Sequence, residues 1–314
     1  MAHEAGARVA PPIIMETAVR QVSERFYLDP RNKERFAALH DLLRTLESTD
    51  VQAGERAVLR WSRTFNNLLQ SGELQTIIGE ILTEMSVSMA FQPGWISNRA
   101  EEWFIADSPN FSLRAYVVRP PVNDVLFSLS QDCLIGNLGQ SPVHFQRHTF
   151  PAGLRRDVFD RNLILSEGSR ETIAPLQSTT LACASDIPEY IIPAATVLVQ
   201  LSPKVYAPLV WVFDRPTRSA LMCSSSYEAP VRNQAVAEAL QYLAMESSAP
   251  VEPFLTALNQ LATNPHHYVR WRALQSLCAI DFDFAKPYLL KACEDEHPTV
   301  AHAARKAAQR LAIA

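Results

Sequence analysis

The chain has 314 residues, of which 47% are apolar and 20% are charged, so it is long enough for two domains or one large one and can bury a sizeable core. Its 29 lysine and arginine residues against 33 aspartate and glutamate residues give a formal net charge of −4. A charge this small argues against a nucleic-acid-binding protein, and the apolar content argues against a disordered chain.

The sequence also argues against a membrane or secreted protein. No apolar run approaches the roughly 20 residues that cross a bilayer. Residues 1–19 lack the basic start and the unbroken apolar stretch of a signal peptide. The five cysteines are isolated and never form a CxxC pair; they are Cys133, Cys183, Cys223, Cys278 and Cys293. We therefore expect reduced thiols in a cytoplasmic protein.

Residues 13–91 have a helical pattern. Apolar residues recur three and four positions apart in four stretches, 15–28, 32–49, 53–69 and 73–91. The turn signals Asp29-Pro30, Ser48-Thr49-Asp50 and Ser71-Gly72 separate these stretches. The sequence predicts an N-terminal helical region over residues 1–99.

Short segments rich in Val, Leu, Phe, Thr and Ser follow from about Trp103 to residue 226. They recur every 10–20 residues or so between clusters of Pro, Gly, Asn and Asp, which is typical of an antiparallel sandwich or barrel. Within this part, residues 166–195 give the weakest strand pattern, and we expect long loops there. The predicted β domain covers residues 100–228.

The helical pattern returns in residues 229–314, where three helices can be superposed. Each carries a valine followed four residues later by an alanine. The pairs are Val231 with Ala235, Val269 with Ala273, and Val300 with Ala304. Further helical stretches lie between them, so the segment is an internal repeat, and repeats of this length indicate a helical solenoid.

Two of these stretches, "NPHHYVRWRALQSL" and "DEHPTVAHAARKAAQRL", resemble the second helix of HEAT-like repeats. The resemblance covers about a quarter of the chain and implies stacked antiparallel helix pairs that offer a surface to a partner protein. His266 and His267 then lie at a loop-to-helix junction, where capping or solvent contact is the favoured role. Tyr268, Arg270 and Trp271 are the candidate partner-binding residues, because aromatic residues and arginine are enriched at binding hot spots.

The best candidate for chemistry is "PVHFQRHTF", residues 142–150. On a strand, alternation places His144, Gln146 and His148 on one face, where two imidazoles can converge on a metal. The segment and its surroundings resemble a cupin-like jelly roll, a family in which histidines and a glutamate hold iron or another divalent metal. The resemblance implies a site at His144, His148 and Glu167, with Glu171 as the other carboxylate, although the spacing here is His-x-x-x-His.

These patterns predict a multi-domain protein of α and β structure: an N-terminal helical segment, a central antiparallel β-sandwich or jelly roll, and a C-terminal HEAT-like helical solenoid. No complete catalytic motif is present, so the catalytic residues are unknown and no cofactor is expected. We expect a non-catalytic interaction protein that binds a protein partner, and neither nucleic acid nor membrane. Two alternatives are a cupin-like iron oxygenase and a metal-free sensor that binds a small molecule in the β domain.

Overall fold

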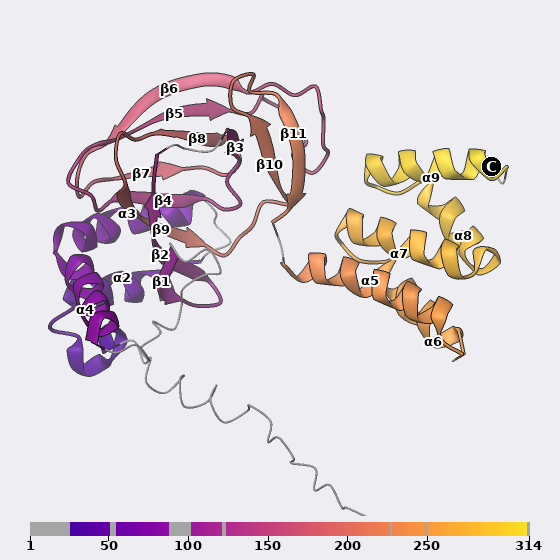
Figure 1. The fold of residues 1–314 in the computed structure, drawn as a ribbon, viewed down its shortest axis with the longest axis horizontal. Helices are drawn as coiled ribbons and strands as arrows, with labels where there is room; N and C mark the ends of the chain where they lie inside the picture. Colours follow the sequence, from indigo (N-terminus) through magenta and orange to yellow (C-terminus); the bar gives the residue numbers. More distant parts are fainter. Residues whose placement is uncertain are drawn as a thin grey trace, which may run out of the picture. The chain divides into compact units, whose positions relative to one another are not determined.

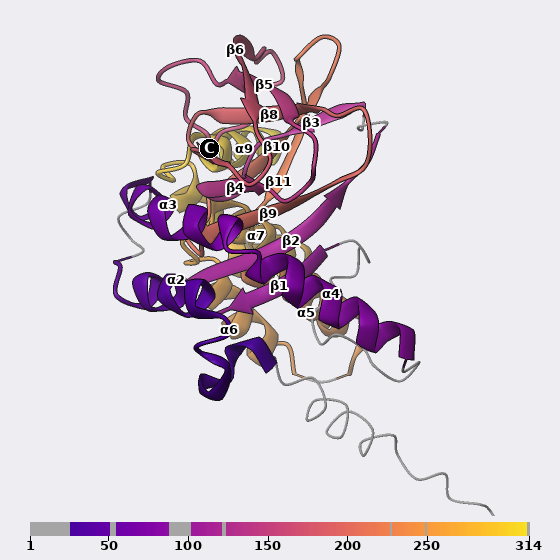
Figure 2. The same ribbon diagram turned by 90° about the vertical axis from the view of Figure 1, so that its left-hand side faces the viewer.

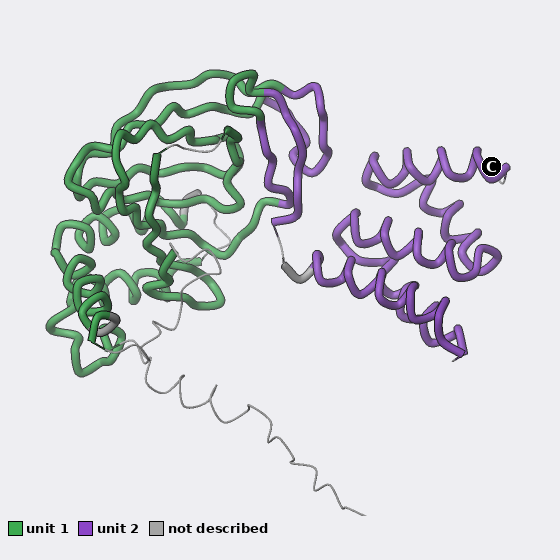
Figure 3. The backbone as a smooth tube through the Cα atoms, in the orientation of Figure 1, with its two compact units in different colours: residues 1–151, 164–207, 214–218 green, residues 152–163, 208–213, 219–314 purple. Residues whose placement is uncertain are grey.

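A computed structural model describes residues 26–50, 55–87, 102–120, 124–226, 228–248 and 250–312. The chain forms two compact units (Figure 3). Unit 1 comprises residues 1–151, 164–207 and 214–218, and unit 2 comprises residues 152–163, 208–213 and 219–314. The units divide the chain differently from the predicted ranges 1–99, 100–228 and 229–314, because the N-terminal helices share a hydrophobic core with the β-strands of unit 1.

The N-terminal part of unit 1 is helical, as the periodicity predicts for its last three stretches. Most of the first predicted helix, residues 15–28, lies outside the described residues. The observed elements are η1 (Phe26–Leu28), η2 (Pro30–Asn32), α2 (Ala37–Glu47), α3 (Glu55–Gln70) and α4 (Glu73–Val87). In α3 the spacing of Trp61, Phe65 and Leu68 places all three side chains on one buried face.

Two antiparallel sheets form the rest of unit 1 (Figure 1). The larger has the order β1 (Glu102–Asp107), β2 (Phe111–Val118), β9 (Thr196–Pro203), β4 (Cys133–Asn137) and β7 (Ser178–Leu181). The smaller has the order β6 (Ser166–Ile173), β5 (Val143–Thr149) and β8 (Asp186–Ile191). Their facing apolar side chains, including Ile135 and Leu198 from one sheet and Phe145 from the other, form one core. An antiparallel β-sandwich is therefore observed, together with the short strand β3 (Val125–Phe127).

The other face of the larger sheet is covered by the N-terminal helices (Figure 2). Leu69 of α3 lies so close to β4 that a Cβ atom at Gly136 would be 2.5 Å from its Cδ1. Glycine at this position therefore lets the helix approach the sheet closely. Residues 166–195, expected to be long loops, instead contain three strands, β6, β7 and β8.

Unit 2 contains a β-hairpin, a loop and five helices. The hairpin is β10 (Leu209–Asp214) with β11 (Ala220–Ser225), and the helices are α5 (Glu228–Glu246), α6 (Glu252–Leu261), α7 (His267–Ile280), α8 (Phe282–Ala292) and α9 (Pro298–Arg310). Helix α7 packs against α5, α6 and α8, and α9 packs on α8 (Figure 1). The predicted helices are confirmed, and their assignment to the HEAT-like family stays a prediction.

Burial separates the first of the three superposed helices from the other two. Val269, Ala273, Val300 and Ala304 are buried, as a repeat core requires. The equivalent residues of α5, Val231 and Ala235, are exposed. The sequence pattern is thus present in all three helices, but in α5 it lies on a face that the other described residues of unit 2 leave exposed.

Candidate functional site

Strand β5 presents the predicted metal-ligating histidines on one face. Its ladder with β8 is regular from His144, opposite Ile191, to Thr149, opposite Asp186. The alternation therefore places His144, Gln146 and His148 together, while Val143 and Phe145 point into the sandwich core. The predicted division of the strand into two faces is confirmed.

The pairing of β5 with β6 contains a bulge that brings Glu167 opposite His148. Gln146 is opposite Arg170, and His148 is opposite Glu167, so three steps along β6 match two along β5. Gly168 lies in this bulge, where a Cβ atom would be 2.2 Å from the carbonyl oxygen of Arg147. Glycine is required here because the two backbones approach closely.

The three predicted ligands nevertheless bond to three different groups. His144 Nδ1 lies 2.8 Å from Thr172 Oγ1. His148 Nε2 lies 2.7 Å from Glu189 Oε2, and Glu167 accepts a hydrogen bond of 2.8 Å from Arg218 Nη1. Each side chain thus already has a polar partner that competes with a metal ion.

Glu189 is a member of this polar face that sequence analysis did not select. Besides His148, it accepts a hydrogen bond of 2.6 Å from Arg215 Nε. Burial raises the pKa of Glu189, but the hydrogen bonds from His148 and Arg215 outweigh it and hold the pKa below its usual value. The result is a His–Glu–Arg cluster of mostly buried side chains in which the carboxylate is ionised.

The residues present do not fit a cupin-like metal centre. Among the residues that the structure describes, no three His, Cys, Asp or Glu side chains gather in an arrangement that could hold a metal ion. Glu171, the alternative carboxylate, is bound by Arg147, whose Nε donates to Glu171 Oε1 at 2.7 Å. We therefore derive no chemistry through iron.

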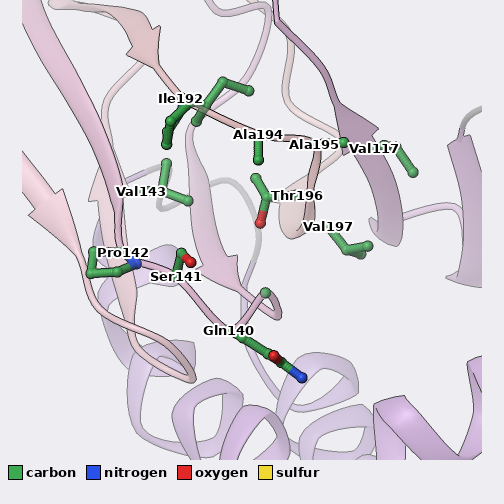
Figure 4. Close-up of a pocket in the computed structure, with 12 residues that line it drawn as sticks. Val117, Gln140, Ser141, Pro142, Val143, Ile192, Ala194, Ala195, Thr196 and Val197 are labelled. Atoms are coloured by element: carbon green, nitrogen blue, oxygen red, sulfur yellow. The ribbon is translucent and has the colours of Figure 1, made fainter.

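A pocket of about 390 Å³ opens at one end of the sandwich, between residues 139–143 and residues 192–197 (Figure 4). Gln140 contributes an amide to its lining, and Ser141 and Thr196 contribute hydroxyl groups. The other lining residues are apolar or glycine, so the lining carries no ionisable side chain. Such a lining suits an uncharged small molecule that has hydrogen-bonding groups.

In unit 2, the predicted partner-binding residues have contacts within the unit. The hydroxyl group of Tyr268 is hydrogen-bonded to Ser225 at the end of β11. Arg270 forms a two-pronged ion pair with Asp295, at 3.0 and 2.7 Å, and also donates to the carbonyl oxygens of the loop before α7. Trp271 is half-buried against the core of α8 and α9. Partner contact through these three residues stays a prediction.

His267 takes part in a ring stack at the start of α7, and His266 precedes it as the N-cap residue. The ring of His267 lies parallel to that of His297, with centroids 3.5 Å apart. His297 Nε2 is 3.1 Å from the carbonyl oxygen of Asp157, in the 152–163 loop. The helix junction thus anchors a loop of unit 2. The expected side-chain capping is not observed, because the His266 side chain makes no capping hydrogen bond.

Comparison with known proteins gives no family. No family model matches the sequence, and no curated protein matches it. One solved structure with partial similarity is the "Crystal Structure of hydroquinone 1,2-dioxygenase PnpCD in complex with Cd2+ and 4-hydroxybenzonitrile", at 8% identity and a TM-score of 0.25 over 32% of this chain. The match spans 62% of that chain. A similarity of this extent establishes neither a shared fold nor a shared activity.

None of the helices in the described ranges is both long and apolar enough to pass through a bilayer.

Proposed function

We propose that this chain is a non-catalytic binding protein whose helical unit docks a protein partner on the exposed face of α5. The observation that carries the proposal is a stripe of seven exposed residues, which we call the α5 face. It consists of Arg232, Ala235, Val236, Ala239, Tyr242, Leu243 and Glu246. Five of the seven are apolar or aromatic, and the two charged residues stand at its ends.

The large apolar and aromatic side chains of the α5 face are highly exposed to solvent. Tyr242 is 67% exposed, Leu243 49% and Val236 47%. Each of the seven residues has another member of the set three or four positions away, so they lie in one stripe along the helix. Contiguous apolar surface of this kind, with charged residues at its rim, is typical of protein-interaction sites.

The internal repeat supports the same proposal. Ala273 of α7 is buried, whereas its equivalent on the α5 face, Ala235, is exposed. In a repeat array each unit buries its apolar face only against a neighbour. A partner on α5 would supply the cover that the rest of unit 2 supplies for α7. Tyr268, Arg270 and Trp271 then contribute by holding the helices in place. We place this interaction in the cytoplasm, in keeping with five cysteines that form no disulfide bond.

A photo-crosslinking amino acid at position 243 tests this function in cells that express the full chain. We expect one abundant crosslinked species, which disappears when Val236→Asp is introduced into the same chain. Position 311 is the matched control, because Leu311 is also 49% exposed but lies at the end of α9. Equal crosslinking from positions 243 and 311, or crosslinking that Val236→Asp leaves intact, would refute the proposal.

A second candidate function is metal-free binding of an uncharged small molecule in the sandwich-end pocket. The pocket volume of about 390 Å³ falls in the usual range for ligand sites. Thermal-shift measurements against uncharged metabolites should then show stabilisation without added metal. Thr196→Val removes one lining hydroxyl and should reduce the shift for the ligand found; a shift that this variant leaves unchanged would place binding elsewhere.

The iron-oxygenase alternative makes a distinct measurable prediction. It requires about one iron per chain, lost when His144 and His148 are both replaced by alanine. Because each histidine has another polar partner, we expect iron well below one equivalent in the purified protein. Stoichiometric iron that depends on both histidines would favour the oxygenase over the binding protein.

A further inference from the structure

We infer that the partner on the α5 face is a second copy of this chain, with the two α5 helices antiparallel about a two-fold axis at Ala239. The inference rests on the proposed function and makes it specific. An interface between identical subunits must match itself, so every residue has to suit the residue that the two-fold axis brings opposite. The α5 face meets this condition along its whole length.

The apolar part of the face is self-complementary in size. With the axis at Ala239, Ala235 lies opposite the partner subunit's Leu243, and Val236 lies opposite the partner subunit's Tyr242. A small side chain therefore meets a large one at the first pair. At the centre Ala239 faces its own copy, where two methyl groups allow the helices to approach closely.

The charged ends of the face match as well. Arg232 stands seven residues before Ala239, and Glu246 stands seven residues after it. The antiparallel arrangement brings Arg232 of each subunit next to Glu246 of the partner subunit. A parallel arrangement would place like charges together at both ends, which is unfavourable. The other acidic residue in the middle of α5, Glu238, lies off the face, 3.2 Å from Arg272 of the same subunit.

A stripe on one helix is small compared with the roughly 800 Å² per subunit that stable dimers commonly bury. We therefore expect a reversible dimer whose dissociation constant lies in the micromolar range. The association must accordingly be measured over a wide concentration range.

Sedimentation equilibrium of the full chain from about 1 μM to about 200 μM tests the inference. We expect a monomer–dimer equilibrium that Leu243→Asp weakens by at least about 100-fold, since two aspartates then lie in the apolar contact. Leu311→Asp, at an equally exposed position outside the face, should leave it unchanged. Far-UV circular dichroism checks that each variant is folded.

Charge reversal tests the antiparallel register itself. Arg232→Glu alone and Glu246→Arg alone should each weaken the dimer about fivefold or more, because each places like charges together at both ends. The double variant Arg232→Glu/Glu246→Arg restores opposite charges and should return the dissociation constant to within about threefold of the original. No rescue, or a dimer insensitive to Leu243→Asp, overturns the inference.

The outcomes separate this inference from the proposed function. A chain that stays monomeric at every concentration overturns the self-association. If position 243 then still crosslinks in cells to a different protein, in a manner that Val236→Asp abolishes, partner binding on the α5 face stands without the dimer. If neither dimer nor face-dependent crosslink is found, both proposals fail.

Discussion

The stacked histidines of unit 2 predict a loss of stability in mild acid. Burial and, as a smaller cause, the neighbouring His297 together lower the pKa of His267 to about 4. In the unfolded chain the pKa returns to about 6.5. The unfolded state therefore binds a proton between these two values while the folded state does not, so the stability falls as the pH falls.

The size of the effect follows from the two pKa values. Each pH unit between about 6.5 and about 4 removes about 1.4 kcal/mol, so that lowering the pH from 7.5 to 5 removes about 2 kcal/mol. The ring of His267 keeps partial contact with solvent, which screens the interaction. We therefore expect a loss of about 1 kcal/mol from this residue.

Urea denaturation at a fixed protein concentration, repeated at pH 7.5, 6.5, 5.5 and 5.0, measures this loss. His267→Gln removes the titrating group and should reduce the pH dependence of the unfolding free energy by about 1 kcal/mol over this range. His302→Gln is the matched control, because His302 is exposed on α9. If His267→Gln and His302→Gln have the same pH dependence as the unmodified chain, the assignment of a lowered pKa to His267 is wrong.

Two further predictions concern unit 1. Arg147→Met leaves the carboxylates of Glu171 and Asp186 without their shared cation. Urea denaturation should then show an unfolding free energy lower by about 3–5 kcal/mol. A loss below about 1 kcal/mol would mean that the two carboxylates find other partners. Gly136→Ala should destabilise by about 1–3 kcal/mol, because the new Cβ atom meets Leu69. Gly79 lies in the middle of α4, where a new Cβ atom would have no other atom within 4 Å, so Gly79→Ala should stabilise the protein by up to about 1 kcal/mol. Thermal denaturation in which both glycine variants change the stability in the same direction would contradict the packing argument.

The elements of the fold that sequence analysis found are those with a strong local period. The apolar spacing predicts one buried face for each of the helices α3 and α7, and the alternation predicts two different faces for strand β5. The structure shows these faces. Strand β6, "SEGSRETI", was expected to be a loop because it is an exposed edge strand with one buried residue, Ile173. Strand β8 contains a proline and also gives no clear alternation. Both strands exist because β5 pairs with them on either side.

Local sequence patterns do not predict contacts between segments that are far apart in the chain. Helix α2 begins after Phe36, which provides no side-chain cap. The backbone N–H groups of Ala38 and Leu39 instead donate to the carboxylate of Glu73, which is 35 and 34 residues further along the chain, respectively. The same limit explains the shared core of helices and strands in unit 1, which no pattern in residues 1–99 indicates.

The alternation of β5 predicts the polar face of this strand, but not the side chains that bond to that face. His148 is held by Glu189, from a segment that was expected to be a loop, and Glu189 is held by Arg215. A signal was present in principle, since Glu189 and Tyr190 alternate on β8 as Gln146 and Phe145 do on β5. Without the pairing of the two strands, however, nothing relates a carboxylate at 189 to a histidine at 148.

The helices of unit 2 show why the same motif can have different surroundings in one chain. Arginine follows valine in both α5 and α7, at Arg232 and Arg270. Arg270 has Asp295, in the turn before α9, within 3.0 Å and is largely buried, so its charge helps to hold the helices of unit 2 together. Arg232 instead lies at the end of the exposed α5 face. The motif is the same in both helices, but only the helices that pack on it in unit 2 decide whether it is buried.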